Sequence, residues 1–214
     1  MPDLYFFIYA FSSLFSIVNP LSGVMIFRSL TSEMSGASKK YVARKSILIA
    51  FFIAVVFSVA GDLILRFFSI TADSLRVAGG VLLFLLAVDM LFARRSGVKY
   101  TSEEIAEAEK REDVSVFPIA MPMLTGPGAI TTVIVLMDGA GTVERKLMVF
   151  AAILLTFVIS YIIFNYSDLM DRVLGVTGTL VATRIMGLFV GAIAVDFVFA
   201  GIWNIYVDKL RLLQ

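Results

Sequence analysis

Apolar residues occur along the chain in six runs, each separated from the next by a polar or charged connection. The runs span residues 4–27, 46–65, 77–93, 114–137, 147–167 and 185–207. Three of them carry no charged residue, and the other three hold one interior aspartate each. Because a helix of about 20 apolar residues crosses the hydrocarbon core of a bilayer, the pattern predicts an all-α, polytopic membrane protein with six transmembrane helices.

Composition supports this prediction and excludes several classes of protein. Of the 214 residues, 59% are hydrophobic and 16% are charged, and the mean hydropathy is +0.94. Soluble domains have roughly 45–50% apolar and about 25% charged residues, so a soluble enzyme, a nucleic-acid binder and a disordered chain are excluded. The net charge of +1 and the absence of Cys and His predict no nucleic-acid partner, no metal and no cofactor.

The second half of the chain repeats the first after a shift of 107 residues. Segment 87–93 then falls on segment 194–200, with five of seven positions identical. Gly80 falls on Gly187, and Pro20 falls on Pro127. Each half holds three predicted spans, and an odd number of spans inserts the second half upside down. The sequence therefore predicts two inverted three-helix repeats, an architecture found in many secondary transporters.

The repeats define the predicted domains and orientation. Residues 1–94 form the first repeat, 95–115 a polar connection, and 116–214 the second repeat. The connections after spans 1, 3 and 5 carry eleven Lys and Arg residues and the opposite side six, setting aside Arg184 inside span 6. By the positive-inside rule, the polar connection is cytoplasmic. We expect a multi-pass protein of the cell (inner) membrane with both termini outside the cytoplasm.

Spans 1 and 4 contain helix-breaking residues at mid-depth and are predicted to be discontinuous. Proline removes a backbone donor, and opened backbone within a membrane is tolerated only inside protein or beside a cavity. Inversion brings the two breaks together, where helix amides suit a carboxylate and free carbonyls suit an ammonium group. Kinks that serve packing alone are the alternative. The candidate substrate-binding residues are Asn19, Pro20, Leu21, Ser22, Gly23, Thr125, Gly126, Pro127, Gly128 and Ala129.

Both segments resemble the MarC family of bacterial and archaeal membrane proteins. Asn19-Pro20-Leu21-Ser22-Gly23 is similar to the Asn/Asp-Pro segment in the family's first span, and the stretch from Thr125 to Ile130 resembles its second characteristic segment. The resemblance extends over the whole chain. It implies a transporter of small neutral amino acids, such as glycine or alanine, with proton coupling. The family name also reflects an association with multiple antibiotic resistance.

Charged residues inside the spans are candidates for proton coupling, because such residues are costly in a bilayer. Asp89 and Asp196 are the candidates. Depth along the helices predicts the crossed ion pairs Asp89–Arg184 and Arg76–Asp196, which would respect the inverted symmetry. Structural ion pairs are therefore the alternative to proton transfer.

Three functional classes follow from these observations. A secondary transporter explains the repeat and the paired breaks; drug or metabolite efflux and an ion channel of the same fold remain alternatives. A channel more often shows charged rings or a multi-subunit filter. The chain has no Gly-x-Ser-x-Gly elbow, so we do not expect an enzyme. The expected partners are a small neutral amino acid and the lipid bilayer, and the oligomeric state is left open.

Overall fold

A computed structural model describes residues 3–92 and 113–211, and these residues form helices with no strands. The predicted all-α class is therefore confirmed. The polar connection predicted at 95–115 lies almost entirely outside the described residues. The elements are α1 (Asp3–Val18), α2 (Pro20–Leu30), α3 (Gly36–Phe67), α4 (Ala72–Leu91), η1 (Ser115–Leu124), α6 (Pro127–Gly139), α7 (Val143–Asn165) and α8 (Ser167–Arg211).

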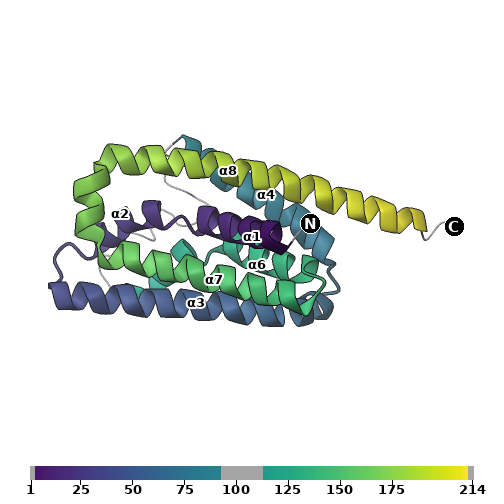
Figure 1. The fold of residues 1–214 in the computed structure, drawn as a ribbon, viewed down its shortest axis with the longest axis horizontal. Helices are drawn as coiled ribbons and strands as arrows, with labels where there is room; N and C mark the ends of the chain where they lie inside the picture. The colour runs from purple at the N-terminus through teal and green to yellow at the C-terminus, as the bar shows by residue number, and fades with distance from the viewer. Residues whose placement is uncertain (1–2, 93–112, 212–214) are drawn as a thin grey trace.

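The helices account for five to six membrane spans. Five stretches are long and apolar enough to cross a bilayer: α1 with α2, α3, α4, α7 and α8. The irregular segment η1 and the helix α6, which meet at 55°, form the sixth when they are counted as one broken span. Figure 1 shows both chain ends toward the right-hand end of the bundle, as an even number of traverses requires.

Local sequence explains where several helices begin. Ser35, Thr71 and Thr142 stand before α3, α4 and α7 and accept the backbone N–H three residues later, at 3.2, 3.1 and 3.4 Å. These hydroxyl caps satisfy donors that have no partner inside the helix. Gly141 has a φ of 69°, which lets the chain turn between α6 and the cap of α7.

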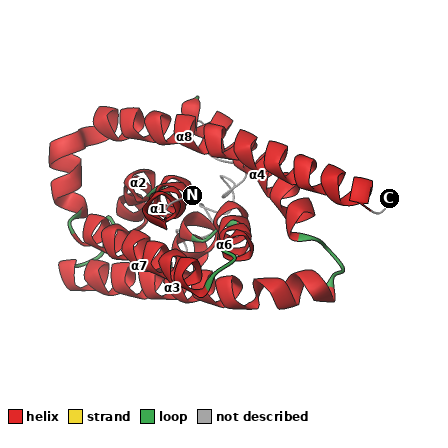
Figure 2. Ribbon diagram, turned by 45° about the vertical axis from the view of Figure 1, so that its right-hand side comes forward, coloured by secondary structure: helices red, strands yellow, loops and turns green. Residues whose placement is uncertain are grey.

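The bundle has three layers. In Figures 1 and 2, α4 and α8 lie on one side, α3 and α7 lie on the other, and α1, α2 and α6 lie between them. The middle helices are the most enclosed. In α6 the residues Gly128, Ala129 and 131–136 are all buried, so this helix is surrounded by protein on every side.

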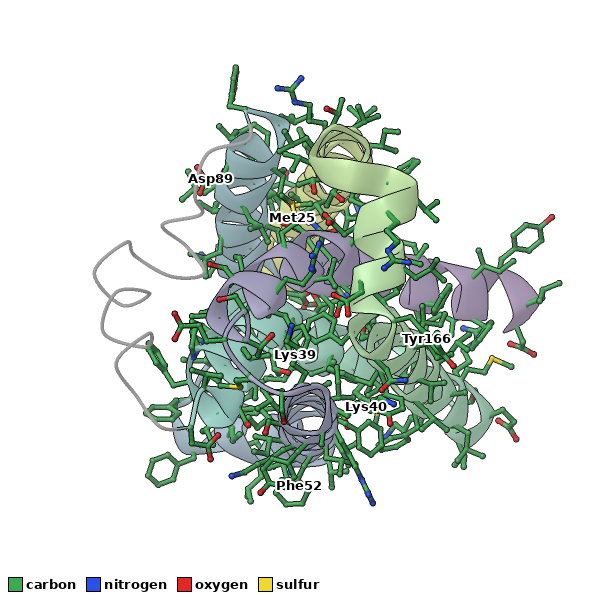
Figure 3. All side chains as sticks on the ribbon, turned by 90° about the vertical axis from the view of Figure 1, so that its left-hand side faces the viewer. Met25, Lys39, Lys40, Phe52, Asp89 and Tyr166 are labelled. Carbon is green, nitrogen blue, oxygen red and sulfur yellow. The ribbon has the colours of Figure 1, made fainter. Side chains whose placement is uncertain are left out.

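The outer helices instead present large apolar side chains to their surroundings. Phe52 on α3, Leu188 on α8 and Phe199 on α8 are 67%, 64% and 71% exposed, and Figure 3 shows Phe52 pointing away from the bundle. Exposed apolar faces of this extent would drive aggregation in water, whereas lipid chains cover them in a bilayer. The fold therefore has a buried centre and a lipid-facing perimeter.

Small residues allow α4 and α8 to pack closely in opposite directions. A β-carbon added at Gly80 would lie 2.9 Å from the Ala194 carbonyl oxygen and 3.0 Å from the Val198 nitrogen. One added at Gly187 would lie 3.3 Å from the Ala87 oxygen and 3.2 Å from the Leu91 nitrogen. Glycine lets the two backbones approach, as in other membrane helix pairs.

Helix α8 is longer than the apolar run that predicted it. The run covers 185–207, whereas α8 contains 45 residues and begins at Ser167. Gly175, with φ 58° and ψ −170°, interrupts the helix and changes its direction. Hydropathy missed residues 167–184 because this stretch is polar at intervals, and helical structure does not require a continuous apolar run.

Candidate functional site

The first candidate segment begins where α1 ends. Asn19 separates α1 from α2 and has a left-handed backbone (φ 48°, ψ 64°), and Pro20 is the first residue of α2. The Asn19 side-chain oxygen accepts the Ser22 N–H at 3.3 Å, and its backbone oxygen accepts the Gly23 N–H at 3.1 Å. Asparagine tolerates this conformation better than most residues and caps the helix that follows.

The second candidate segment lies between η1 and α6. Phe117 and Met121, each followed by proline, have extended backbones inside η1, because a proline disfavours helical geometry in the residue before it. Gly126 is also extended (φ −83°, ψ 179°), and Pro127 then opens α6. A β-carbon at Gly126 would lie 2.6 Å from the Pro122 oxygen, so the turn requires glycine.

Two contacts place these segments beside each other. A β-carbon added at Gly128 would lie 3.6 Å from Ile17 Cγ2, so the end of α1 adjoins the start of α6. One added at Gly23 would lie 3.6 Å from Met123 Cε. The end of α1 therefore adjoins the start of α6, and the end of η1 adjoins the start of α2, although these segments are distant in sequence.

A small cavity lies at the start of α6. Its volume is about 10 Å³, and its walls come from Ile17, Leu86 and residues 123, 124 and 126–129. A volume of roughly 10–15 Å³ holds one water molecule. In this conformation the two segments therefore leave no room for an amino acid, and substrate binding there requires them to separate.

Some of the predicted binding groups already have partners within the protein. The Ser22 amide donates to the Asn19 side-chain oxygen, and the Gly23 amide donates to the Asn19 backbone oxygen. The Thr125 hydroxyl is fully buried and donates to the Ala50 carbonyl of α3 at 3.0 Å. In this conformation the Ser22 and Gly23 amides are thus engaged within the start of α2. The amides of Gly128 and Ala129 lie in the first turn of α6, which has no helical acceptor for them.

The predicted crossed ion pairs do not form. Arg76 pairs with Asp73 at 3.2 Å, one turn earlier on α4. The Asp196 carboxylate instead accepts a 3.0 Å hydrogen bond from the Tyr9 hydroxyl of α1. The predicted pairs do not form because the sequence does not fix the rotation of each helix about its axis. This rotation decides which side chains face each other.

Asp89 is half-buried and lies on the outer part of α4, where Figure 3 labels it. Among the residues that the structure describes, no ion pair within 4.0 Å joins it to Arg184, which is exposed on α8. The second crossed pair is therefore also wrong. Of the two acidic candidates, Asp196 contacts the middle layer, through its hydrogen bond with Tyr9. Nothing in the sequence pattern pointed to Tyr9.

One ion pair fixes the entry to η1. The Asp113 carboxylate accepts from the Lys45 ammonium of α3 and, at 2.9 Å, from the Ser115 N–H. The hydrogen bond from Lys45, followed by those from Ser115, lowers the pKa of Asp113 to about 2. This pair joins α3 to the start of the broken span.

Comparisons with known proteins agree with this architecture. The family described as "MarC family integral membrane protein" matches residues 4–206. A UPF0056 membrane protein of Aquifex aeolicus is 40% identical over 199 residues, covering 93% of each chain. The UPF0056 membrane protein YhcE of Escherichia coli K12 is 34% identical and covers 94% of each chain.

A third relative is archaeal. The UPF0056 membrane protein MJ1677 of Methanocaldococcus jannaschii is 38% identical over 94% of this chain and 97% of its own. No solved structure matches the chain. The family match over nearly the whole chain and these full-length relatives show that the protein belongs to the MarC family of integral membrane proteins.

Proposed function

We propose that this protein is a secondary transporter that moves small neutral amino acids, of the glycine and alanine class, across the cell membrane. One observation carries the proposal: the two helix breaks adjoin each other, since the end of α1 lies against the start of α6 and the end of η1 lies against the start of α2. Broken helices beside a buried cavity are the usual setting of a transporter's substrate site.

The chemistry of the site suits a zwitterion. Gly128 and Ala129, in the first turn of α6, line the cavity, and a helix N-terminus favours a carboxylate. The opposite wall includes Ile17, at the negative end of α1, which favours an ammonium group. No charged side chain is needed to hold a ligand that carries both charges.

The size of the cavity supports a small substrate and an alternating mechanism. At about 10 Å³ the cavity represents a closed conformation. An amino acid enters when the end of α1 moves away from Gly128, and each added side-chain carbon increases the separation required. Glycine and alanine are therefore favoured over longer amino acids.

Reciprocal contacts support the inverted repeat. Under the 107-residue shift, Gly80 becomes Gly187 and Ala87 becomes Ala194. Gly80 approaches the oxygen of Ala194, and Gly187 approaches the oxygen of Ala87. The α4–α8 pair therefore has the contacts expected of two equivalent helices related by a two-fold axis.

The packing between the halves supports the same symmetry. Helix α1 packs on α7, and its repeat equivalent η1 packs on α3, the equivalent of α7. Each broken span thus lies against the other half of the chain. Two halves that exchange elements in this way can rock about the shared site, which is how inverted repeats alternate access.

Proton coupling is assigned to Asp196, with Asp89 as the second candidate. Asp196 contacts Tyr9, which lies on the helix that leads to the Asn19 break. A protonation change at Asp196 would therefore act directly on α1. We place both termini outside the cytoplasm, following the distribution of Lys and Arg.

The test is uptake of radiolabelled alanine into proteoliposomes, with and without an imposed pH gradient. Wild-type protein should accumulate alanine only with the gradient. The variant Gly128→Leu should lose uptake, because its β-carbon alone would lie 2.9 Å from Leu83 Cδ2 and the rest of the side chain would fill the cavity. Gly36→Leu is the matched control, since no atom lies within 4 Å of a β-carbon there.

Two results would contradict the proposal. Wild-type uptake of alanine by well-folded Gly128→Leu protein would place the transport site elsewhere and leave the breaks as packing kinks. Unitary currents without gradient-driven accumulation would identify a channel, and movement of drugs but not amino acids would identify an efflux protein.

A further inference from the structure

A second cavity lies between α2 and α8, away from the two helix breaks. Its volume is about 100 Å³, against about 10 Å³ at the start of α6. Figure 3 looks toward this end of the bundle and labels Met25 on α2 beside α8. The cavity is lined by Val24, Met25, Arg28, Ser167, Asp171 and Thr179. Its wall therefore combines a cation, an anion, two hydroxyls and two apolar side chains.

The charged groups of this cavity come from separate helices. The Arg28 guanidinium forms a close ion pair with Asp171, and its Nε lies 3.8 Å from the Asp168 carboxylate. The Arg28 and Asp171 side chains are 35% and 45% exposed, so neither is enclosed by the protein. These residues connect α2, which follows the first break, to the beginning of α8.

The interruption of α8 gives the cavity its shape. Gly175 lies midway between Asp171 and Thr179, and its positive φ turns the helix there. Residues on both sides of the turn consequently face the same space. The Thr179 hydroxyl donates to the Gly175 carbonyl at 2.8 Å, which leaves its oxygen lone pairs directed to other donors.

We propose that this cavity is an access site that binds the amino acid as a zwitterion, with its carboxylate on Arg28 and its ammonium group on Asp171. The inference rests on the proposed function and adds a second station for the same substrate. A zwitterion replaces both partners of the existing ion pair, so neither charge is left unpaired. A simple anion would meet Asp171 and Asp168, and a simple cation would meet Arg28.

Two aromatic rings, one on α2 and one on α7, pack together near the first helix break. Phe27 and Phe164 are each 1% exposed, and their ring centroids are 4.9 Å apart. Phe164 also adjoins Gly23, one turn after Asn19. A substrate held at Arg28 therefore lies one residue from a buried ring pair that also adjoins the start of α2.

The test measures equilibrium binding of three ligands to the purified full-length protein. Alanine carries both charges, propionate lacks the ammonium group and ethylamine lacks the carboxylate. Wild-type protein should bind alanine at least about tenfold more tightly than either analogue, the change expected when one charge-assisted hydrogen bond is lost. Binding is followed by calorimetry, because this readout does not depend on transport.

Two variants assign each charge to its partner. Asp171→Asn should weaken the binding of alanine about tenfold. It should leave the affinity for propionate unchanged or higher, since Arg28 then no longer pairs with Asp171. Arg28→Gln should weaken the binding of alanine and of propionate but not that of ethylamine. The matched controls are Asp62→Asn and Arg66→Gln, which alter an exposed ion pair of 2.9 Å on α3 and should bind all three ligands as wild type does.

The outcomes separate this inference from the proposed function. Wild-type alanine affinity in Asp171→Asn and Arg28→Gln protein, with binding abolished by Gly128→Leu, would overturn the access site and leave the transporter proposal intact. Failure of wild-type protein to bind any of the ligands would overturn both. If Arg28→Gln does not fold, the double variant with Asp171→Asn removes both charges and should show the same loss of alanine binding with no preference between the analogues.

Discussion

The Tyr9 hydroxyl of α1 donates a 3.0 Å hydrogen bond to the Asp196 carboxylate of α8, joining the first helix of the protein to its last. These residues are 187 positions apart. Tyr9 lies on the helix that ends at the Asn19 break, and Asp196 belongs to the segment that repeats residues 87–93. The contact therefore connects an ionisable group of α8 to the helix that ends at Asn19.

Replacing Asp196 with Asn should abolish accumulation of alanine against its gradient but preserve exchange of labelled for unlabelled alanine. The amide keeps the size of the side chain and can still accept from Tyr9, but it carries no exchangeable proton. Uptake and counterflow in proteoliposomes measure the two activities separately.

Tyr9→Phe is the control for this substitution. It removes the hydrogen bond and keeps the acid, so accumulation should remain while stability falls by about 0.5–1.5 kcal/mol. Undiminished accumulation by Asp196→Asn would exclude Asp196 as the proton carrier and leave Asp89 to be tested.

Substitutions of Asn19 should separate the two properties that this residue supplies. Asn19→Gly keeps access to the left-handed backbone and loses the side-chain cap, whereas Asn19→Ala loses both. We expect Asn19→Ala to lower stability by about 1–2 kcal/mol and Asn19→Gly by less. Thermal unfolding in detergent ranks them; equal losses would show that the backbone conformation contributes nothing.

Alanine at Gly80 or Gly187 should destabilise the α4–α8 pair. At Gly80 the new methyl group would lie 2.7 Å from Val198 Cγ2 and 2.9 Å from a backbone oxygen. Overpacking of this kind costs about 1–3 kcal/mol, and Gly80→Ala should have the larger effect because backbone moves less readily than side chains. Gly191→Ala is the control, since its methyl group would meet Ala87 Cβ at an ordinary 3.5 Å. A melting temperature that distinguishes neither variant from Gly191→Ala would contradict the close packing.

Stability should depend on pH through Asp113. Its pKa is lowered to about 2, against roughly 3.9 in an unfolded chain, so the folded state favours the carboxylate. The contribution is complete above pH 3.9 and is lost as pH falls toward 2. It should be small, because the Asp113 side chain is 46% exposed and exposed pairs are screened. Asp113→Asn should make the melting temperature less dependent on pH between pH 4 and pH 2. If the fall in melting temperature over this range is unchanged in the variant, other carboxylates cause it.

The topology can be tested directly with a reporter fused after Gln214. An enzyme that is active only outside the cytoplasm should be active at this position, and a fusion within residues 95–115 should be inactive. The opposite pattern would show that the bias of Lys and Arg was misread.

The spans and the two proline-containing segments are predictable from the sequence because they depend on local properties. Long apolar runs predict helices of membrane length, and Pro20 and Pro127 each open a helix in the structure. The repeat also predicted which glycines are equivalent, and Gly80 and Gly187 make matching contacts.

The hydrogen-bond and ion-pair partners of polar side chains could not be predicted from the sequence, because they depend on the rotation of each helix about its axis. Hydropathy does not fix this rotation when most faces of a helix are apolar. Thr125 consequently bonds to Ala50 rather than facing the cavity, and Arg76 pairs with Asp73 rather than Asp196. The capping of α2 by Asn19 could have been predicted, since an asparagine directly before a proline at a helix start is a capping pattern.

The turn at Gly175 has a consequence for how the protein sits in the lipid. A straight helix of 45 residues would be roughly 68 Å long, more than twice the hydrocarbon thickness of about 30 Å. In Figure 1 the part of α8 before the turn runs across the end of the bundle rather than along it. Leu169 and Val173 on this arm are 51% and 69% exposed, and Asp171 lies between them. Exposed apolar side chains beside a charged one are typical of a helix that lies in the membrane interface, so we expect the arm to lie at the headgroup level and the Arg28 cavity to open at that depth.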